Sequence, residues 1–538
     1  AQPPTIPREP TATYYRNEHL PADSEEDNQM KYYIGLDNGG TTTKAALYTE
    51  KGKEVGVVSA DTETESLKPD YAERDMEAMW QANCSVIRSL LKKTGVAGKD
   101  IRSLAVCGHG KGLYLWGKDN KPARKGIGST DNRAWEYPLM WERDGTAEKV
   151  FELSCQHIMP CQPVSLLAWL RDHEPQTIEN IRWIFSCKDY IRFRLTGEAY
   201  GEYSDYSGSN LMNLHTRAYD SDLMALFGLA GLMDALPPLK SASDVCGTVS
   251  EEAAALTGLA AGTPVAGGLF DIDACALAVG ITDDTHICMI AGTWSINEYI
   301  RRTPVTDGTA WMNSLFAMKE YYLIEECSPT SAGNQEWILK TLFPEMLTEA
   351  AEKGESAYDE INHKIASIPA DAFCPIFLPF ILGTNVHPNA KGCFVGIGAN
   401  HSRAHILRAV YEGVCFSHKY HLDKLLRTRR DLPRAIRLSG GVTKSGVWTQ
   451  MFADVMELPI ETVSAKEAGA LGSAMCAAVA AGDQASIESA VTSMTRVSDT
   501  VLPDPGASEA YRKKYALYKK AIEGLDGIWE DVQRMQDR

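Results

Sequence analysis

An aspartate followed by a glycine and threonine turn is the first group in the chain that could do chemistry. In residues 31–50, the apolar run YYIGL leads into Asp37, a Gly-Gly-Thr-Thr turn over residues 39–42 and a second apolar run, KAALY. Glycines with positive φ let backbone N–H groups approach an anion, and threonine hydroxyls add donors. An aspartate at a strand end offers a hard oxygen ligand for Mg²⁺. The pattern predicts a phosphate-binding β-hairpin, although an ordinary tight hairpin has the same signals.

A second segment repeats this design. In HICMIAGTWSINEYI, residues 286–300, an apolar run precedes Gly292 and Thr293, a hydroxyl follows at Ser295, and another apolar run ends the segment. Two such hairpins, each opening a long α/β stretch, are typical of the actin-like (ribonuclease H-like) ATPase fold, in which two related domains bind one nucleotide between them. We therefore expect an α/β protein with two actin-like domains flanking a nucleotide cleft.

Helices and strands must alternate to position these groups. Residues 71–95 predict an amphipathic helix, and residues 101–116 predict two strands around the turn GHGKG. Residues 255–280 contain a short strand, a Gly-Gly turn that ends at Asp271 and a helix of small residues. If a domain boundary lies near residue 275, Asp271 falls at the cleft, where ligands bind.

The second half carries three further expectations. A Gly-Gly turn at residues 440–441 follows a strand and precedes a helix that opens near residues 444–445. Residues 466–482 form a small-residue helix that packs closely, either against a nucleotide or simply in the core. Residues 510–536 predict one amphipathic helix.

Composition restricts the class of protein. The 538 residues are 44% hydrophobic and 23% charged, which suits two large globular domains. A net charge of −17 disfavours nucleic-acid binding. The sequence contains no uninterrupted apolar run of about eighteen residues, so it does not predict a membrane span. Thirteen cysteines without a C-x-x-C pair indicate reduced thiols in a cytoplasmic protein.

The first residues differ from the rest of the chain. Residues 1–29 contain several prolines and the acidic run ADSEEDNQ, and they lack the apolar core of a secretory signal. We interpret them as a disordered leader or an artificial extension. The predicted domains are then residues 30–275 and residues 276–538.

A multi-position motif gives the chain a resemblance to a known family. Its residues are Gly392, Phe394, Gly396 and Ile397, followed after seven positions by His405, Ile406, Ala409, Val410, Tyr411 and Glu412. From about Lys31 to its final helix, the chain resembles the FGGY family of carbohydrate kinases. A second family signature, around residues 159–169, is only partly kept, because Leu166 stands where the family usually has lysine.

Several segments are similar to the L-xylulose kinase branch of this family, which also handles 3-keto-L-gulonate. They are GHGKGLYLW, STDNRA, QPVSLLAWLRDHEP, GGLFD and ECSPTSAGNQEW. Glycerol and D-xylulose kinases usually carry tryptophan in a W-x-D-x-R turn, where this chain has Ser129 before Asp131 and Arg133. The hydroxyl fits a polyhydroxylated ketose better than glycerol.

The resemblance implies a general base and a metal ligand. Asp271 would accept the proton of the sugar hydroxyl; the alternative is that it only caps the following helix, and Asp273 is a second candidate base. Asp37 would hold Mg²⁺ through water, or stabilise its hairpin as an Asx turn, or both.

The resemblance also implies binding residues. Those expected at the sugar are His109, Lys111, Ser129, Asp131 and Asp271. Those expected at the nucleotide are Gly39, Gly40, Thr41, Thr42, Gly292, Thr293, Asn334, Gly440 and Gly441.

The implied activity is phosphorylation of a sugar hydroxyl with ATP and Mg²⁺, most simply of a ketopentose such as L-xylulose or of 3-keto-L-gulonate. Residues 30–275 would bind sugar, and residues 276–538 would bind nucleotide and end in the C-terminal helix. We expect a cytoplasmic homodimer without nucleic-acid or membrane partners. Two alternatives stay open: a kinase for D-xylulose, ribulose or a polyol, and an actin-like nucleotide-binding sensor without kinase activity. Asp271 together with GHGKG and STDNRA favours a kinase, because a sensor has no use for a base facing a polar sugar turn.

Overall fold

The computed structural model describes residues 30–68 and 70–536. The predicted leader, residues 1–29, lies outside the described residues. Residues 31–68 and 70–536 belong to one compact unit. The predicted boundary after residue 275 falls inside helix α10 (Asp271–Ala278) and stays a prediction.

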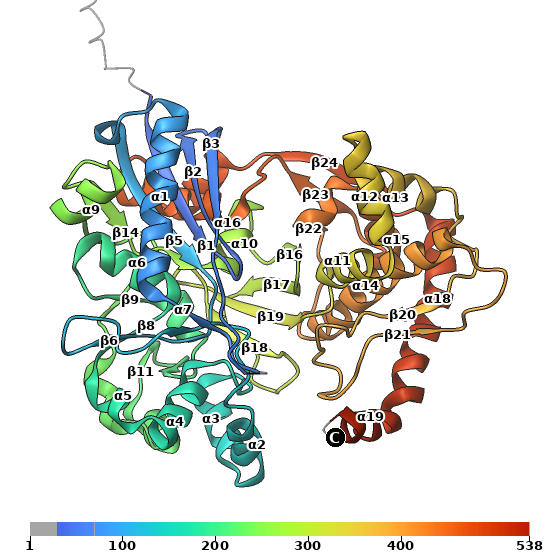
Figure 1. Ribbon diagram of the computed structural model, residues 1–538, viewed down its shortest axis with the longest axis horizontal. Helices are drawn as coiled ribbons and strands as arrows, with labels where there is room; N and C mark the ends of the chain where they lie inside the picture. The colour runs from blue at the N-terminus through green and yellow to red at the C-terminus, as the bar shows by residue number, and fades with distance from the viewer. Residues whose placement is uncertain (1–29, 69, 537–538) are drawn as a thin grey trace, which may run out of the picture. The chain divides into compact units, whose positions relative to one another are not determined.

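Two seven-stranded sheets organise the chain (Figure 1). The strands of the first sheet, in spatial order, are β13 (Val245–Thr248), β14 (Pro264–Ala266), β5 (Ile101–Gly108), β1 (Tyr32–Asn38), β2 (Thr42–Thr49) and β3 (Glu54–Asp61), with β15 (Leu269–Phe270) also paired to β5. The strands of the second sheet are β18 (Met312–Leu315), β19 (Tyr322–Ser328), β17 (Ser295–Arg301), β16 (His286–Ala291), β22 (Ala435–Ser439), β23 (Ile460–Val463) and β24 (Val497–Val501). Smaller sheets pair β4 (Glu73–Arg74) with β7 (Gly126–Ile127), β6 (Tyr114–Gly117) with β8 (Ile181–Phe185), β9 (Gly201–Glu202) with β12 (Leu239–Lys240), β10 (Met212–Asn213) with β11 (Ala218–Tyr219), and β20 (Ile376–Leu378) with β21 (Cys393–Val395).

The same five-strand pattern occurs in both sheets. In the first, the β1–β2 hairpin continues into antiparallel β3, while β5 and β14 add parallel strands on the other side of β1. In the second, the β16–β17 hairpin continues into antiparallel β19, while β22 and β23 add parallel strands beside β16. The expected duplication of an α/β unit is therefore confirmed.

Helices connect and cover the strands. Those before β16 are α1 (Met76–Thr94), α2 (Glu136–Arg143), α3 (Thr146–Ser154), α4 (Pro163–His173), α5 (Pro175–Asn180), α6 (Cys187–Thr196), α7 (Tyr203–Ser207), α8 (Ser221–Leu226), α9 (Glu251–Thr257) and α10 (Asp271–Ala278). Those after it are α11 (Ala332–Leu342), α12 (Pro344–Lys353), α13 (Ala357–Ala366), α14 (Arg403–Arg427), α15 (Gly446–Met456), α16 (Ala468–Ala480), α17 (Ile487–Met494), α18 (Pro505–Leu525) and α19 (Trp529–Gln536). No helix in the described part of the chain is long and apolar enough to cross a membrane.

Local signals set most helix ends. Asp75 caps α1 by accepting the Ala78 N–H, and Gly95 closes it in the left-handed conformation at φ 71°. Ser445 caps α15 by accepting the Trp448 N–H. The single helix expected over residues 510–536 is wrong, because a 3₁₀ turn over residues 526–528 separates α18 from α19. Gly524 lies shortly before this turn and Gly527 lies within it, and glycine has low helix propensity.

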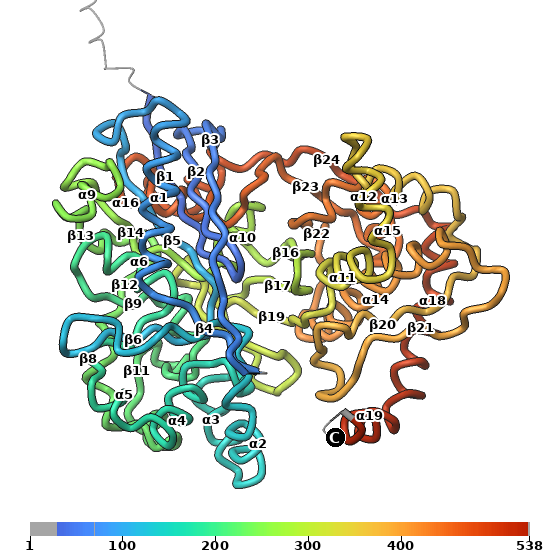
Figure 2. The backbone as a smooth tube through the Cα atoms, in the orientation of Figure 1, coloured from blue at the N-terminus to red at the C-terminus, as the bar shows by residue number. Residues whose placement is uncertain are grey.

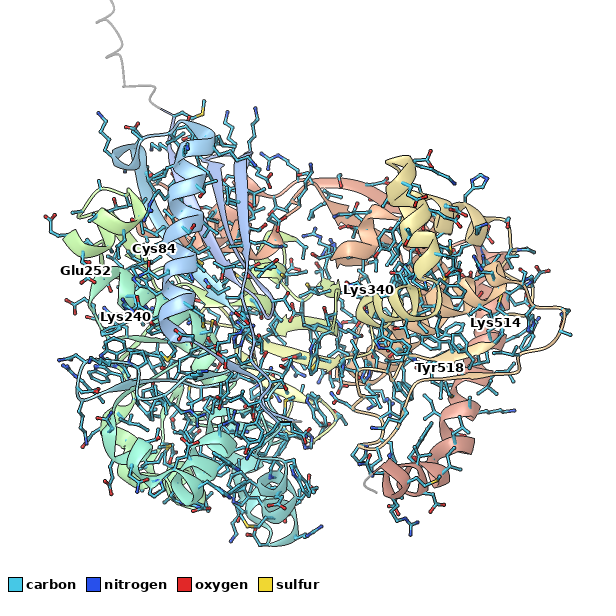
Figure 3. The ribbon with its side chains drawn as sticks, viewed as in Figure 1. Cys84, Lys240, Glu252, Lys340, Lys514 and Tyr518 are labelled. Carbon is cyan, nitrogen blue, oxygen red and sulfur yellow. The ribbon has the colours of Figure 1, made fainter. Side chains whose placement is uncertain are left out.

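A buried ion pair connects helix α18 to helix α14. The Lys514 ammonium lies 2.8 Å from the Glu412 carboxylate, which also accepts from Arg408 at 2.9 Å. Tyr518 on the same helix is fully buried. Figure 3 labels Lys514 and Tyr518, on the right of the view. Removing one partner would leave a buried charge uncompensated, so the C-terminal helix is an integral part of the second half.

Helix α16 comes from late in the chain but packs on the first sheet. Figure 2 shows this orange segment beside the blue strands. A Cβ added at Gly35 of β1 would lie 1.8 Å from the Ala470 carbonyl oxygen, and one added at Gly472 would lie 2.1 Å from the Ala274 carbonyl oxygen on α10. Only glycine permits such close backbone approach. The small-residue helix expected at residues 466–482 is therefore a core helix that joins β1 to α10.

Candidate functional site

Asp271 begins helix α10 immediately after strand β15. Gly268, in the preceding turn, has φ 75°, and a Cβ there would lie 2.0 Å from the Val106 carbonyl oxygen of β5. The Phe270 N–H donates to the Ser204 hydroxyl at 3.0 Å. A glycine-dependent turn and this hydrogen bond fix where the helix starts. The Asp271 side chain is half-buried, so it keeps an open face.

Asp271 stands between an anion and a cation. Burial, and then the Asp37 carboxylate, raise the pKa of Asp271 well above its usual 3.8, while the Lys111 ammonium opposes that rise. Burial likewise raises the pKa of Asp37, with the Lys44 ammonium opposing it. Two carboxylates in one partly desolvated place resist ionising together. This arrangement suits a proton acceptor beside a site for a cation.

Asp37 lies at the end of β1, opposite Lys44 in the hairpin register. Lys44 forms an ion pair with Glu467, just before α16, at 2.8 Å. A Cβ at Gly469 would lie 2.7 Å from the Asp37 carboxylate. Asp37 belongs to the second-to-last residue pair before the turn of its hairpin. The residue at the same place in the second hairpin is Ile290. Only the first hairpin therefore carries a metal-ligating group at this position.

Lys111 extends over the Phe270 ring, with its ammonium 4.8 Å from the ring centroid and 3.8 Å from the Glu325 carboxylate. Burial alone would lower the pKa of Lys111, but Glu325 and other nearby groups raise it instead, so the side chain is a cation. Its backbone has φ 60°, a left-handed conformation that costs free energy for a residue with a Cβ. The GHGKG turn thus holds a positive charge close to Asp271.

The other predicted sugar residues have different surroundings. Residues 128–129 adjoin the Lys111 turn, because Leu113 and Ile127 exchange backbone hydrogen bonds, and Ser129 is half-buried there. Asp131 is buried and accepts hydrogen bonds from the Ala72 and Arg133 N–H groups and from the Arg133 guanidinium. Its carboxylate is thus occupied in holding the turn.

His109 faces inward. Its Nε2 lies 2.8 Å from the Tyr114 hydroxyl, and burial lowers the pKa of the imidazole to about 3. The ring is therefore neutral, and it packs on Tyr114 rather than beside Lys111. No feature of the sequence distinguishes this buried orientation from one that faces a ligand.

Asp273 points away from Asp271, because residues two apart on a helix lie on opposite sides. It is fully buried and accepts the Ala317 N–H at 3.2 Å, while its other oxygen lacks a partner. Burial, and then the Glu202 carboxylate, raise its pKa well above 3.8. The fully buried Glu298 belongs to the same group of acids, and burial and then Asp273 raise its pKa. These acids pack behind α10, away from the open face of Asp271.

A cavity of about 570 Å³ lies beside the second hairpin. It is lined by Ala291, Gly292, Thr293, Ala332, Gly333, Gln335, Glu336, Ser356, Tyr358, Asp359, Asn362, Tyr411, Gly441, Val442, Lys444, Ser445 and Trp448. Beneath it, Gly440 has φ 100°, and a Cβ there would lie 2.4 Å from the Ala291 carbonyl oxygen. Glycine is required at this position so that β16 and the turn after β22 can meet. A Cβ added at Gly292 or at Gly441 would have no other atom within 4 Å, so both residues border open space on that side.

Some predicted nucleotide residues do not line this cavity. Asn334 is buried; it donates to the Pro329 carbonyl and accepts the Ile381 N–H, and so supports the wall from behind. The first hairpin, with Thr41 and Thr42, lies outside the lining. Gly39 and Gly40 do not use the positive φ that glycine permits. Arg74 instead donates to both of their carbonyl oxygens and holds the turn open.

Sequence reasoning missed several residues of the cavity. Tyr411 and Trp448 stack with ring centroids 3.8 Å apart, and Ser445 donates to Asn362 at 2.7 Å. In the sequence, Tyr411 is one position of the family motif and Trp448 is an apolar residue of a predicted helix. Neither signal indicates that the residue lines a cavity. Their meeting depends on the packing of α14 against α15, for which the local sequence gives no signal.

The volume and lining of the cavity fit a nucleotide, whose purine needs apolar walls and whose phosphates need backbone donors. No cluster of three or more His, Cys, Asp or Glu side chains suitable for a metal occurs among residues 30–68 and 70–536. Mg²⁺ keeps most of its water and takes one or two carboxylates together with phosphate oxygens. The side chain of Asp37 is a carboxylate of this type.

Comparison with known proteins agrees with this geometry. The N-terminal domain of the FGGY family of carbohydrate kinases matches residues 32–278, and the C-terminal domain of that family matches residues 287–481. The L-xylulose/3-keto-L-gulonate kinase of Escherichia coli K12 is 39% identical over 93% of this chain and 98% of its own. A probable L-xylulose kinase of Pasteurella multocida is 37% identical over 93% of this chain and 100% of its own.

Solved structures show the same fold. The gluconate kinase of Lactobacillus acidophilus superposes with a TM-score of 0.84 at 25% identity, covering 94% of this chain and 100% of its own. The ligand-bound xylulose kinase of the same organism superposes with a TM-score of 0.84 at 25% identity, covering 93% and 100%.

Proposed function

Because the chain belongs to the FGGY family of carbohydrate kinases, we propose that its acceptor is a ketopentose such as L-xylulose, or 3-keto-L-gulonate. The chain is a phosphotransferase that phosphorylates a sugar hydroxyl with ATP and Mg²⁺. The observation that carries the acceptor proposal is similarity along almost the whole chain to relatives named for L-xylulose, at 34–39% identity. The site is compatible with it, because Lys111 and Ser129 offer polar contacts to a polyhydroxylated molecule.

Asp271 is the general base in this proposal. Its open face lets a sugar hydroxyl approach, and its raised pKa gives the carboxylate a strong affinity for the proton that the hydroxyl loses. Lys111, paired with Glu325, orients the sugar and keeps part of the Asp271 population ionised. Asp273 has no such access, because it is fully buried on the other face of α10.

The second half binds the nucleotide. Gly292, Thr293 and Gly441 would lie along the phosphates, and the Tyr411 and Trp448 walls would pack near the base or ribose. Bound Mg²⁺ supplies charge neutralisation on the phosphate oxygens. Asp37 would orient that ion through its water ligands, and the close contact of Gly469 holds the carboxylate in place. Thr41 and Thr42 remain predicted phosphate contacts of the first hairpin.

The compartment and the assembly are also proposed. All thirteen cysteines are free thiols, which suits the reducing cytoplasm; disulfides in protein isolated from cells under alkylating conditions would argue against it. The homodimer remains a prediction, and a monomer mass by light scattering would contradict it.

The acceptor is tested with a coupled ADP-release assay over L-xylulose, 3-keto-L-gulonate, D-xylulose, L-ribulose, D-ribulose and glycerol. We expect kcat/KM for L-xylulose or 3-keto-L-gulonate to exceed that for glycerol by at least about 10³-fold, because a site built to bond several hydroxyls rejects analogues that lack them. A higher kcat/KM for D-xylulose or a ribulose would overturn the acceptor proposal while leaving the family assignment intact.

Asp271→Asn should lower kcat by about 10²- to 10⁴-fold, the usual contribution of a positioned base, without weakening nucleotide binding. In the wild type, kcat/KM should fall as the pH drops through the raised pKa of Asp271, since only the ionised carboxylate accepts a proton; the acid limb should therefore lie above pH 3.8. Asp273→Asn is the matched control. If it costs more turnover than Asp271→Asn, with both proteins folded, Asp271 is not the base.

Asp37→Asn should raise the Mg²⁺ concentration needed for half-maximal turnover by about tenfold or more, because a neutral amide orients a hydrated cation less well. The KM for sugar should change little. A Mg²⁺ titration at saturating ATP measures both effects. An unchanged Mg²⁺ requirement would leave Asp37 as a hairpin residue only.

A further inference from the structure

A second cavity lies on the other side of α10 from Asp271. Its volume is about 300 Å³, and its walls come from two distant parts of the chain, residues 202–242 and residues 315–319. The second wall is tied to α10, because the Ala317 N–H donates to Asp273. The nucleotide cavity shares no lining residue with it.

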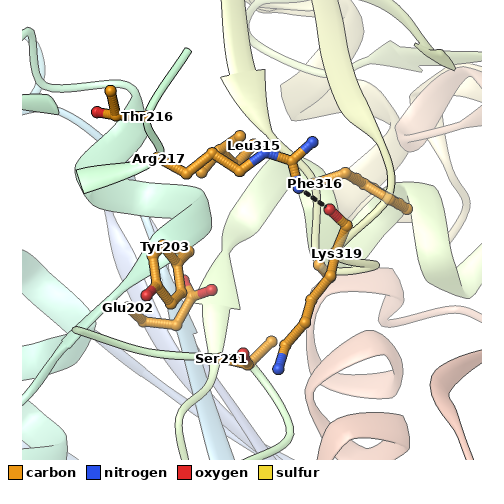
Figure 4. Close-up of a pocket in the computed structure, with 10 residues that line it drawn as sticks. Glu202, Tyr203, Thr216, Arg217, Ser241, Leu315, Phe316 and Lys319 are labelled. Atoms are coloured by element: carbon orange, nitrogen blue, oxygen red, sulfur yellow. Dashed lines mark hydrogen bonds between the residues drawn. The ribbon is translucent and has the colours of Figure 1, made fainter. Parts of the chain in front are cut away.

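Two cationic side chains, those of Arg217 and Lys319, line this cavity. Figure 4 shows the Lys319 side chain along one side of the hollow, with Tyr203 and Glu202 on the other. The Lys319 ammonium has no hydrogen bond or ion pair within the described chain. Arg217 donates to the Lys319 carbonyl oxygen and to the Tyr322 hydroxyl, which leaves its second terminal amino group without a partner in the described residues. Donors of two positive side chains are thus available to a ligand.

The one acid of the lining does not cancel these charges. Glu202 accepts hydrogen bonds from the Ser204 N–H at 2.9 Å and from the Ser204 hydroxyl at 2.6 Å. Its carboxylate also lies 3.4 Å from the Lys188 ammonium, which Glu202 shares with Asp189 and Asp205, and burial raises the pKa of Glu202. In a chain with a net charge of −17, an excess of cations around one hollow marks a place where an anion is attracted.

The remaining lining defines the rest of the ligand. Tyr203, Thr216 and Ser241 bring hydroxyl groups, and Phe316 with Ala242 provides an apolar floor. The volume is at the lower end of small-molecule sites, about 300 to 1,000 Å³, which suits a monosaccharide phosphate better than a nucleotide. We propose that this cavity is a second binding site, which takes a phosphorylated sugar with its phosphate at the Lys319 ammonium and its hydroxyls at Tyr203, Ser241 and Arg217. This proposal of a second binding site does not depend on which sugar the kinase phosphorylates.

The test is equilibrium dialysis of the full chain against radiolabelled D-ribose 5-phosphate, with inorganic phosphate as competitor. We expect saturable binding of one probe per chain with a dissociation constant below about 1 mM. Lys319→Gln should weaken it at least tenfold, and Lys319→Arg should retain it. Lys319 is exposed, so neither change threatens folding. The matched control is Lys513→Gln, which removes an equal charge from the exposed surface of α18 and should leave binding unchanged.

Four results would overturn the proposal. They are no saturable binding, equal loss in Lys319→Gln and Lys513→Gln, loss in Lys444→Gln of the nucleotide cavity instead of Lys319→Gln, and displacement by inorganic phosphate at equal concentration. The third result would place the probe at the nucleotide, and the fourth would show that the sugar hydroxyls contribute nothing.

Discussion

The contact of α16 with β1 and α10 is the constraint on which the site depends. Through Gly35 and Gly472, backbones approach so closely that a single added methyl group would overlap a carbonyl oxygen. Asp37 ends β1 and Asp271 begins α10, so the relative position of the two carboxylates is set by the helix that touches both elements. Close-packed interiors deform little, and side chains mounted on such elements are held more precisely than side chains on loops.

The electrostatics of the site follow from this packing. Burial raises the pKa values of Asp37 and Asp271, and the Asp37 carboxylate raises that of Asp271 further; Lys44 opposes the rise for Asp37, and Lys111 opposes it for Asp271. Two acids without cations nearby would both stay protonated, and two acids in full solvent would both be weak bases. In the proposed mechanism the same residue type has two roles, because Asp37 lies near the end of a hairpin strand and Asp271 lies at a helix start.

The sequence predicted what local signals encode. Alternating apolar runs with a Gly-Thr turn predicted both hairpins and hence the duplicated sheets, and the helix predicted over residues 71–95 ends at Gly95, although it begins later, after Asp75. It failed where tertiary packing decides: the inward orientation of His109 and the place of Asn334 behind the cavity wall depend on neighbours distant in sequence. The break before α19 was missed because the apolar periodicity continues across it. The site roles of Asp37 and Asp271 remain predictions that the geometry accommodates.

Turnover of the folded Gly472→Ala variant, compared with that of Gly524→Ala, tests most directly whether α16 positions the site. The added methyl group would lie 2.1 Å from the Ala274 carbonyl oxygen, whereas nothing lies within 4 Å of the corresponding position at Gly524, an exposed residue of α18. We predict that Gly472→Ala loses about 1–3 kcal/mol of stability through overpacking and also loses turnover at temperatures where it is fully folded. Gly524→Ala should keep full turnover and gain about 0.5–1 kcal/mol from helix propensity. Equal turnover in the two variants would contradict the account, because the two carboxylates would then keep their positions without the close contact of α16.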